Sequence, residues 1–351
     1  MTRVTTSKDV AKAAGVSQPT VSRALAGHPQ VSPATRERVR KAAQELGYVP
    51  QESGRVLRSR RTRRIAVVSS PDDLLNPFHP QLIVPLHQAL TAAGYRTTLL
   101  AETEDAAVLA QLTDGSVDGV VLTATDTGSA VPRHLAASGV PHVLVNRLVP
   151  EEGHPSCVAD NRQGAADIAA LVAGLGHTEV ALVLGPRRLS TSLDREAGFR
   201  SVLASGRSVR TRVLRGGHDH ATGVAAAQSL LDTAHRPTAI LCASDEIALG
   251  VLHEARLRGV AVPGELTVTG FDDIPMAGWE PYALTTVRHD AGRMAAEAVR
   301  LLLSQLSPDA DGAAPESVVL HADVVLRGRT PHQPHDSFLI HLGTWRRCHR
   351  L

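Results

Sequence analysis

Polar side chains that could bind a ligand follow several predicted strands of this chain. They are Asn146 and Arg147, Asp160 and Asn161, Arg195, Ser244 and Asp245, and Asp272 and Asp273. A carboxylate, a guanidinium and small hydroxyl or amide groups in one cleft suit a ligand with many hydroxyls, such as a sugar or a nucleoside. Each such hydroxyl needs a paired donor or acceptor. Helix caps and turns use the same residue types, so each residue taken alone fits that role equally well.

Sequence motifs of catalysis are missing. There is no GxGxxG after a strand, no Walker loop, no GxSxG elbow and no HExxH. Residues 218–220 read His-Asp-His, but no third ligand lies at motif spacing, which favours a loop or helix start over a metal site. Cys157, Cys242 and Cys348 are far apart and predict isolated reduced thiols. We therefore expect neither an enzyme nor a bound cofactor or metal.

A separate group of residues near the N-terminus has the pattern of two short helices joined by a turn. Thr6 and Asp9 have the spacing of a capping box, which begins the first helix, and Gly15 supplies the positive φ that ends it. Ser17 is a good N-cap for the second helix, and Pro19 lies in its first turn, where an N–H is not needed. This pattern predicts a helix-turn-helix, whose second helix enters the major groove of DNA.

The second helix has an inward and an outward face. Val21 and Leu25 are predicted to face inward, which leaves an outward set to contact base edges. That set is Gln18, Pro19, Ser22 and Arg23. A third helix begins at Ser32 and ends before Gly47. Residues 6–47 therefore predict three helices around one small core.

Charge is distributed unevenly along the chain. Residues 1–64 hold three Lys and eleven Arg against four Asp and Glu, a net charge of about +10, whereas the whole chain is at +2. Residues 65–351 therefore carry about −8. A basic head on an acidic body predicts that the head alone binds a polyanion.

Residues 50–64 join the head to the body and are predicted to form a hinge. The stretch has little apolar content and many arginines, and the segment from Gly54 to Arg58 could form one short helix. Isolated helices of that length are unstable in water, and Gly costs about 1 kcal/mol in a helix relative to Ala. We expect the segment to be helical only when another molecule holds it. A plain basic linker is the alternative.

From Ile65 onward, short apolar runs alternate with segments of helical spacing. Continuous apolar strands separated by helices are typical of a parallel sheet covered on both faces. The first cycle has strands near 65–68, 97–100, 119–122 and 143–145, and the second near 180–184, 209–213, 239–242 and 266–269. Two doubly wound lobes of this kind predict a cleft between them, with ligand groups at the carboxyl ends of the strands.

The predicted fold is thus an all-α helix-turn-helix domain followed by an α/β body of two doubly wound parallel-sheet lobes. The head is expected at residues 1–49, the hinge at 50–64 and the body at 65–330. The first lobe is assigned residues 65–157 and 288–315, the second 158–287 and 316–330, and residues 331–351 predict a disordered tail. No secretory signal and no membrane-spanning run is visible in the sequence, so we expect a cytoplasmic protein.

Several runs of this sequence are those of a known family. In the head they are residues 8–17 (KDVAKAAGVS), 20–23 (TVSR), 31–36 (VSPATR) and 46–50 (LGYVP). In the body they are residues 76–78 (NPF), 118–119 (DG), 197–199 (AGF), 244–250 (SDEIALG), 270–273 (GFDD) and 284–287 (LTTV). On these runs the chain resembles the LacI/GalR family of bacterial transcriptional regulators over roughly residues 4–330.

The resemblance implies a homodimer, or a tetramer, whose heads read a near-palindromic DNA operator. It also implies lobes similar to a periplasmic sugar-binding fold, joined by three crossovers. The implied base contacts are Gln18, Pro19, Ser22 and Arg23, the phosphate contacts Thr6, Ser17 and Thr20, and the hinge contacts Arg55 and Leu57. Leu57 would be an apolar wedge in the minor groove. The implied effector contacts are Phe78, Asn146, Arg195, Ser244 and Asp272.

The sequence therefore predicts a ligand-responsive DNA-binding transcriptional regulator. We expect a repressor that a small polar effector switches, a sugar or a nucleoside. The alternative is a sugar-binding protein without a DNA role, which would share the two lobes but would have no basic head. Operator binding is expected to order the paired hinges, and effector in the cleft to change how the lobes of one protomer lie against each other.

Overall fold

The computed structural model describes residues 5–48, 61–101, 106–151, 153–204, 209–307 and 314–328. Two compact units divide the chain, the head at Met1–Arg61 and the body at Thr62–Leu351. None of the helices described combines the length and the apolar character needed to cross a bilayer. The predicted hinge contacts Arg55 and Leu57, and the predicted tail, lie outside the described residues.

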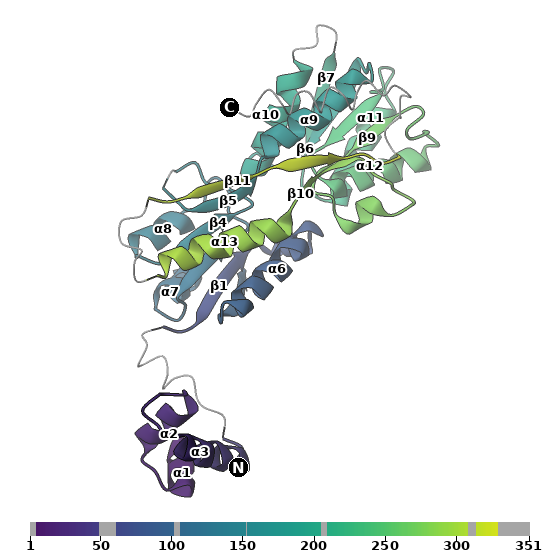
Figure 1. The fold of residues 1–351 in the computed structure, drawn as a ribbon. Coiled ribbons are helices and arrows are strands. Elements are labelled where there is room, and N and C mark those ends of the chain that lie inside the picture. Colours follow the sequence, from purple (N-terminus) through teal and green to yellow (C-terminus); the bar gives the residue numbers. More distant parts are fainter. Residues whose placement is uncertain are drawn as a thin grey trace, which may run out of the picture. The chain divides into compact units, whose positions relative to one another are not determined.

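The head consists of three helices around a small core (Figure 1). They are α1 (Ser7–Ala14), α2 (Gln18–Leu25) and α3 (Pro33–Glu45). Val10, Val21 and Val39 supply one fully buried residue from each helix. The residues expected to begin the helices do so, because their side chains satisfy free N–H groups at each start.

The helix caps of the head are those that the sequence predicts. The Thr6 and Asp9 pair forms a capping box, and Gly15 follows α1 with a φ of 63°. The Ser17 side chain accepts a hydrogen bond from the Thr20 N–H, and Ser32 begins α3 in the same way. These caps fix where α1 and α2 start relative to each other.

The first lobe of the body contains a six-stranded parallel sheet in the order β11-β5-β4-β3-β1-β2. The strands are β1 (Arg64–Ser69), β2 (Arg96–Ala101), β3 (Gly119–Leu122), β4 (His142–Val145), β5 (Ser156–Ala159) and β11 (Ser317–Leu320). Short helices α5 (Pro71–Leu75) and α8 (Val131–Ala137) accompany α6 (Phe78–Ala92), α7 (Ala106–Thr113) and α13 (Ala291–Gln305).

Alternate residues of β1 show how helices cover both faces of this sheet. Ile65 and Val67 pack in the cluster that includes Leu82 of α6, whereas Ala66 and Val68 pack in the cluster that includes Leu135 of α8. Helices α6 and α13 lie side by side on the first face (Figure 1). All four strand residues are at most 2% exposed, as expected for a central strand of a doubly wound sheet.

The second lobe contains a four-stranded parallel sheet in the order β7-β6-β8-β9. Its strands are β6 (Glu179–Leu184), β7 (Arg210–Arg215), β8 (Ala239–Cys242) and β9 (Thr267–Thr269). Its helices are α9 (Asn161–Gly174), α10 (Ser190–Leu203), α11 (His220–Leu231), α12 (Asp245–Leu257) and the 3-10 turn η1 (Pro275–Gly278). Helix α9 packs on α10, and α11 packs on α12.

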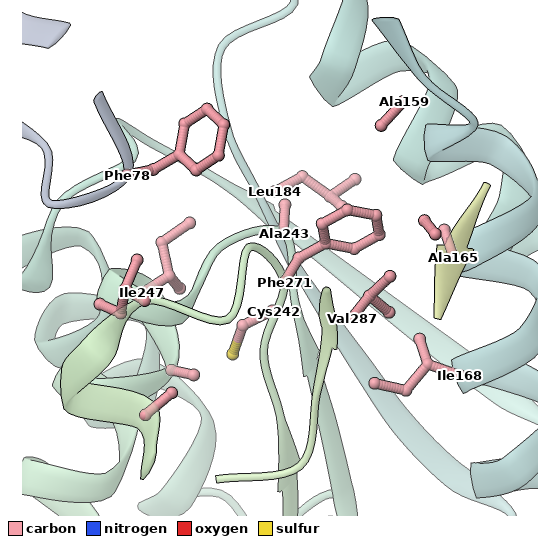
Figure 2. Close-up of a cluster of buried hydrophobic side chains, with 14 of the residues drawn as sticks. Phe78, Ala159, Ala165, Ile168, Leu184, Cys242, Ala243, Ile247, Phe271 and Val287 are labelled. Atoms are coloured by element: carbon pink, nitrogen blue, oxygen red, sulfur yellow. The ribbon is translucent and has the colours of Figure 1, made fainter. Parts of the chain in front are cut away.

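Two strands near the junction of the lobes form a small antiparallel sheet of their own. They are β10 (Thr286–His289) and β12 (Ala322–Val325). The chain passes between the lobes after β5, after β10 and after β11. Phe271 lies at the centre of the buried cluster here, close to Val287 of β10, with Ile168 of α9 on the same side (Figure 2).

The assignment of residues 316–330 to the second lobe is wrong for β11. That strand pairs with β5 in the first sheet, where Val318 lies opposite Cys157, and Figure 1 shows it alongside β5. Residues 158 and 159, also assigned to the second lobe, complete β5 in the same sheet. Only His321 separates β11 from β12, so nothing in the sequence marks the change of sheet.

The start of the body is fastened to the first lobe by one carboxylate. Asp118 Oδ1 accepts hydrogen bonds from the Thr62 N–H (2.6 Å) and hydroxyl (2.8 Å), and its Oδ2 accepts one from the Arg63 N–H (2.9 Å). Arg63 has a φ of 54°, a conformation that a non-glycine residue keeps only where its surroundings hold it. The hydrogen bonds to Asp118 hold it here.

Candidate ligand cleft and nucleic-acid interface

Four of the five predicted effector residues lie around one small cavity between the lobes. Phe78 and Asn146 come from the first lobe, and Arg195 and Asp272 from the second. Asn76, His79, Arg147, Thr191 and His218 complete its lining. The polar residues that follow parallel strands thus meet at one edge, as the doubly wound topology requires.

Backbone conformation helps to place two of these side chains. Asn146 directly follows β4 with a φ of 71°, and Asp272 follows β9 with a φ of 112°. Positive φ is uncommon for residues with a Cβ and is concentrated at functional sites. Both residues are buried, at 5% and 8% exposed, so the surrounding structure keeps them in this conformation.

Arg195 is the most strongly held polar residue of the cleft. It is 3% exposed and donates to Asn161 Oδ1 (2.8 Å), to the Ala243 carbonyl oxygen (2.6 Å) and to Asp272 Oδ1 (2.8 Å). Its guanidinium carbon lies 3.8 Å from the centroid of the Phe271 ring. Burial by itself would raise the pKa of Asp272, but Arg195 and His289 outweigh it and hold that pKa below its usual value.

The first lobe has a matching pair of charges. Arg147 donates two hydrogen bonds to Asp73, at 2.7 and 2.6 Å, and His79 Nε2 lies 3.4 Å from the same carboxylate. Burial acts to raise the pKa of Asp73, whereas His79 and Arg147 lower it well below its usual range. Arg147 Nε and His79 Nδ1 are buried without a hydrogen-bond partner among the described residues, so each keeps an unused hydrogen-bonding capacity beside the cavity.

His218 faces both guanidinium groups. Burial, followed by Arg147 and Arg195, lowers its pKa to about 3, so the imidazole is neutral near pH 7. Its Nε2 lies 3.1 Å from the Ser192 hydroxyl. Gly185 at the end of β6 makes room for the ring, since a Cβ there would overlap it.

These charges balance. Each lobe contributes one guanidinium and one carboxylate, and the nearby His218 is neutral. A ligand that brought a full charge would leave one of these buried groups without compensation, which is costly. The pocket therefore suits a neutral, strongly polar ligand.

The cavity has a volume of about 20 Å³, roughly the space of one water molecule. Asp272 also lines a second cavity of about 680 Å³, together with Gln81, His289 and Arg293, a volume in the range of small-molecule sites. His289 Nδ1 and Gln81 Nε2 are buried without a partner among the described residues. The Asp272 carboxylate thus lines both the small cavity and the large cavity at the junction of the lobes.

Ser244, the fifth predicted effector residue, does not line the smaller cavity. Its hydroxyl accepts from the Ile247 N–H (3.3 Å) as the N-cap of α12 and donates to the His218 carbonyl oxygen (3.3 Å). It therefore supports the segment that carries His218. Asp219 caps α11 by accepting from the Thr222 N–H, so the His-Asp-His run is a helix start.

The outward face of α2 is open for contact with DNA. Gln18, Pro19 and Arg23 are exposed and Ser22 is half-buried, whereas Val21 and Ala24 are buried in the core of the head. The Ser17 and Thr20 hydroxyls lie 2.8 Å apart. Thr6 donates both its N–H and its hydroxyl to Asp9.

Comparisons with known proteins identify the family of this chain. The family described as bacterial regulatory proteins, lacI family, matches residues 6–51, and a periplasmic binding protein-like domain matches residues 169–330. The transcriptional regulator CelR of Thermobifida fusca is 33% identical over 328 residues, covering 91% of this chain and 96% of CelR. The chain belongs to the lacI family. As a member of the lacI family, it is a ligand-responsive, DNA-binding transcriptional regulator.

Other relatives of this lacI-family chain are also regulators. The transcriptional repressor CytR of Escherichia coli K12 is 32% identical over 339 residues, covering 94% of this chain and 97% of CytR. Among solved structures, a CelR–cellobiose complex is 31% identical with a TM-score of 0.70, covering 93% of this chain and 99% of that one. A lac repressor dimer bound to operator and an anti-inducer is 25% identical with a TM-score of 0.83, covering 94% and 100%.

Several residues of the lacI-family cleft are not among the predicted effector contacts. In the sequence Arg147 only follows a predicted strand, and nothing there indicates its bidentate bond to Asp73, 74 positions away. His79 and Thr191 lie in helices and resemble ordinary surface or cap residues in the sequence. His218 follows β7, and this position after a strand is the one feature of the sequence that indicates a place in the cleft.

Proposed function

We propose that this protein is a repressor that binds a near-palindromic operator as a homodimer, or as a tetramer, in the cytoplasm. Gln18, Pro19, Ser22 and Arg23 would contact bases, and Thr6, Ser17 and Thr20 would contact phosphates. The supporting observation is the exposed face of α2 on a head that is far more basic than the body. The solved lac repressor dimer on its operator has the same fold.

The hinge is proposed to act as the link between effector and DNA. Arg55 and Leu57 would contact the minor groove, with Leu57 as the wedge that unstacks the central base step. Both residues lie outside the described part of the chain, and the proposal rests on the family resemblance of the head and hinge.

The proposed effector is a neutral sugar that contacts Phe78, Asn146, Arg195 and Asp272, with Ser244 acting through His218. The single observation that carries this is the pairing of Arg195 with Asp272 in the lining of one cavity, which Arg147, the partner of Asp73, also lines. Because the cavity holds roughly one water, the lobes or these ion pairs must move when a sugar ring enters. The cellobiose complex of the relative CelR makes cellobiose the first candidate.

Two measurements test the function. A gel shift with the full chain on random and on selected duplexes distinguishes a regulator from a sugar-binding protein. A regulator would shift the selected duplex, whereas a sugar-binding protein without a DNA role would shift neither duplex. Thermal unfolding with cellobiose, other neutral sugars, nucleosides and sugar phosphates tests the effector class. A ligand at 100 times its Kd adds about 2.7 kcal/mol to the free energy of unfolding. Stabilisation by sugar phosphates alone would contradict a neutral effector.

A further inference from the structure

A hydrogen bond inside the head ties an exposed residue of α2 to the first helix. The Nε2 group of Gln18 donates to the Ser7 hydroxyl oxygen at 2.8 Å. Ser7 is the first residue of α1, and Gln18 is the first residue of α2. The contact therefore joins the two helix starts, 11 positions apart in the chain.

Both ends of this contact are held in place. The capping box of Thr6 and Asp9 fixes the backbone at Ser7. The Ser17 cap and the fixed φ of Pro19 fix the backbone on both sides of Gln18. Ser7 is half-buried, whereas Gln18 is exposed. The Ser7 hydroxyl thus selects one direction for a side chain that would otherwise sample many rotamers.

The chemistry of the amide decides what the held side chain can bind. A glutamine amide has two N–H donors and one carbonyl acceptor. Ser7 uses one N–H, which leaves the second N–H and Oε1. In the major groove, adenine presents an acceptor at N7 beside a donor at N6, the complement of those two groups, whereas guanine presents two acceptors.

We propose that Ser7 is a positioning residue that makes Gln18 select adenine. Ser7 holds the Gln18 amide with its free N–H and Oε1 outward, so that this donor and this acceptor are already in position before the head binds DNA. The inference rests on the proposed operator binding and names the base that one position of each half-site requires. If the amide were held the other way, with Oε1 accepting from Ser7, two N–H groups would face the groove and guanine would be preferred.

The test is selection of bound sequences from a randomised duplex pool with the full chain. The variants are Ser7→Ala, Ser7→Thr, Gln18→Ala and the control Thr5→Ala. Thr5 donates to the Leu46 carbonyl oxygen at 3.0 Å, so its replacement removes a comparable hydrogen bond of the head without touching Gln18. Circular dichroism melts show whether each head remains folded.

The wild type is expected to select adenine at one symmetry-related position, and Gln18→Ala to lose that preference. Ser7→Ala should lower the preference for adenine about threefold to tenfold, part of what a bidentate base contact contributes. It should leave affinity for duplexes without that adenine unchanged. Ser7→Thr keeps the hydroxyl and should retain the preference, and Thr5→Ala should match the wild type.

Four outcomes overturn the proposal. They are a Ser7→Ala profile that equals the wild type, a Ser7→Ala variant that loses affinity equally on all sequences, a wild type that prefers guanine, and a Gln18→Ala profile that equals the wild type. If the wild type selects no symmetric site, operator reading by α2 is itself wrong. The wild-type profile therefore distinguishes failure of the proposed function from failure of the role of Ser7.

Discussion

At the scale of single residues, the cleft depends on charges that are buried and paired. Arg195 and Asp272 are both nearly inaccessible, and each is the other's main ionic partner. A buried pair contributes little net stability, but removal of one partner leaves an uncompensated charge and is strongly destabilising. Variants of the site must therefore separate loss of ligand contact from loss of fold.

Asp272→Asn is the variant that makes this separation. The amide oxygen can still accept from Arg195, and asparagine tolerates positive φ. We expect the free energy of unfolding to fall by about 3–5 kcal/mol, because Arg195 keeps an uncompensated charge. Operator affinity should stay within twofold, and stabilisation by the effector should disappear. Thermal shift and gel shift measure the two properties, and Asp126→Asn on the surface is the matched control. Retention of the full ligand-induced shift would remove Asp272 from the effector site.

His218 makes stability depend on pH. Its pKa of about 3 in the folded protein is below the ordinary value of 6.5, so between these values only the unfolded chain binds the proton. Stability contributed by the neutral ring is complete above about pH 6.5 and is lost as pH falls, by about 1.4 kcal/mol per unit. Urea unfolding at pH 7 to 4.5 should show a shallower decline for His218→Gln than for the wild type. The exposed His235→Gln should decline as the wild type does, and equal slopes for all three would contradict this role.

At the scale of elements, close contact between helices is set by glycine. Gly223 of α11 and Gly250 of α12 face each other, and a Cβ on Gly250 would overlap the carbonyl oxygen of His220. The two helices therefore pack backbone to backbone, which only glycine permits at this contact.

Gly250→Ala should accordingly destabilise the body, although alanine is the better helix former. Overpacking of this kind costs about 1–3 kcal/mol, against a gain of roughly 1 kcal/mol or less in helix propensity. Urea unfolding of the full chain measures the difference. Gly264→Ala is the control, because the nearest atom to its new Cβ, on Ala261, is 3.5 Å away. Equal stability of the two variants would show that α11 can move away from α12.

Elements also show what the sequence could predict. Strands with continuous apolar runs, and the gathering of Asn146, Arg195 and Asp272 at their carboxyl ends, follow from local pattern and parallel topology. Two features do not. The pairing of Arg147 with Asp73 cannot be predicted, because the two residues are far apart in the sequence and only the folded structure brings them together. The passage from β11 to β12 through His321 has no turn residue to mark it, so both strands look like parts of one lobe.

At the scale of the whole molecule, charge is segregated between two units. The head and hinge carry about +10, and the rest of the chain about −8. Phosphate contacts by the head release counterions, so affinity for DNA should depend on salt far more than the net charge of +2 suggests.

Operator affinity should therefore fall by about 10³-fold or more between 50 and 200 mM salt, if the bound protein neutralises six or more phosphates. Fluorescence anisotropy with a labelled duplex measures this dependence. Replacement of the exposed Arg38 by Gln should reduce affinity similarly on all sequences and leave base preference unchanged. A flat salt dependence would show that the basic residues do not meet the phosphates.

The contact of Asp118 with Thr62 and Arg63 has a mechanical consequence. It attaches the first residues of the body to the start of β3, which belongs to the first lobe only. Suppose that a ligand rotates the second lobe as a rigid body and does not deform the first lobe. The contact of Asp118 with Thr62 and Arg63 would then stay unchanged, and the rotation would not be passed on to the head through this contact. For ligand binding in the cleft to change binding to the operator, the first lobe must itself deform or, in the proposed homodimer, must be displaced against the second protomer.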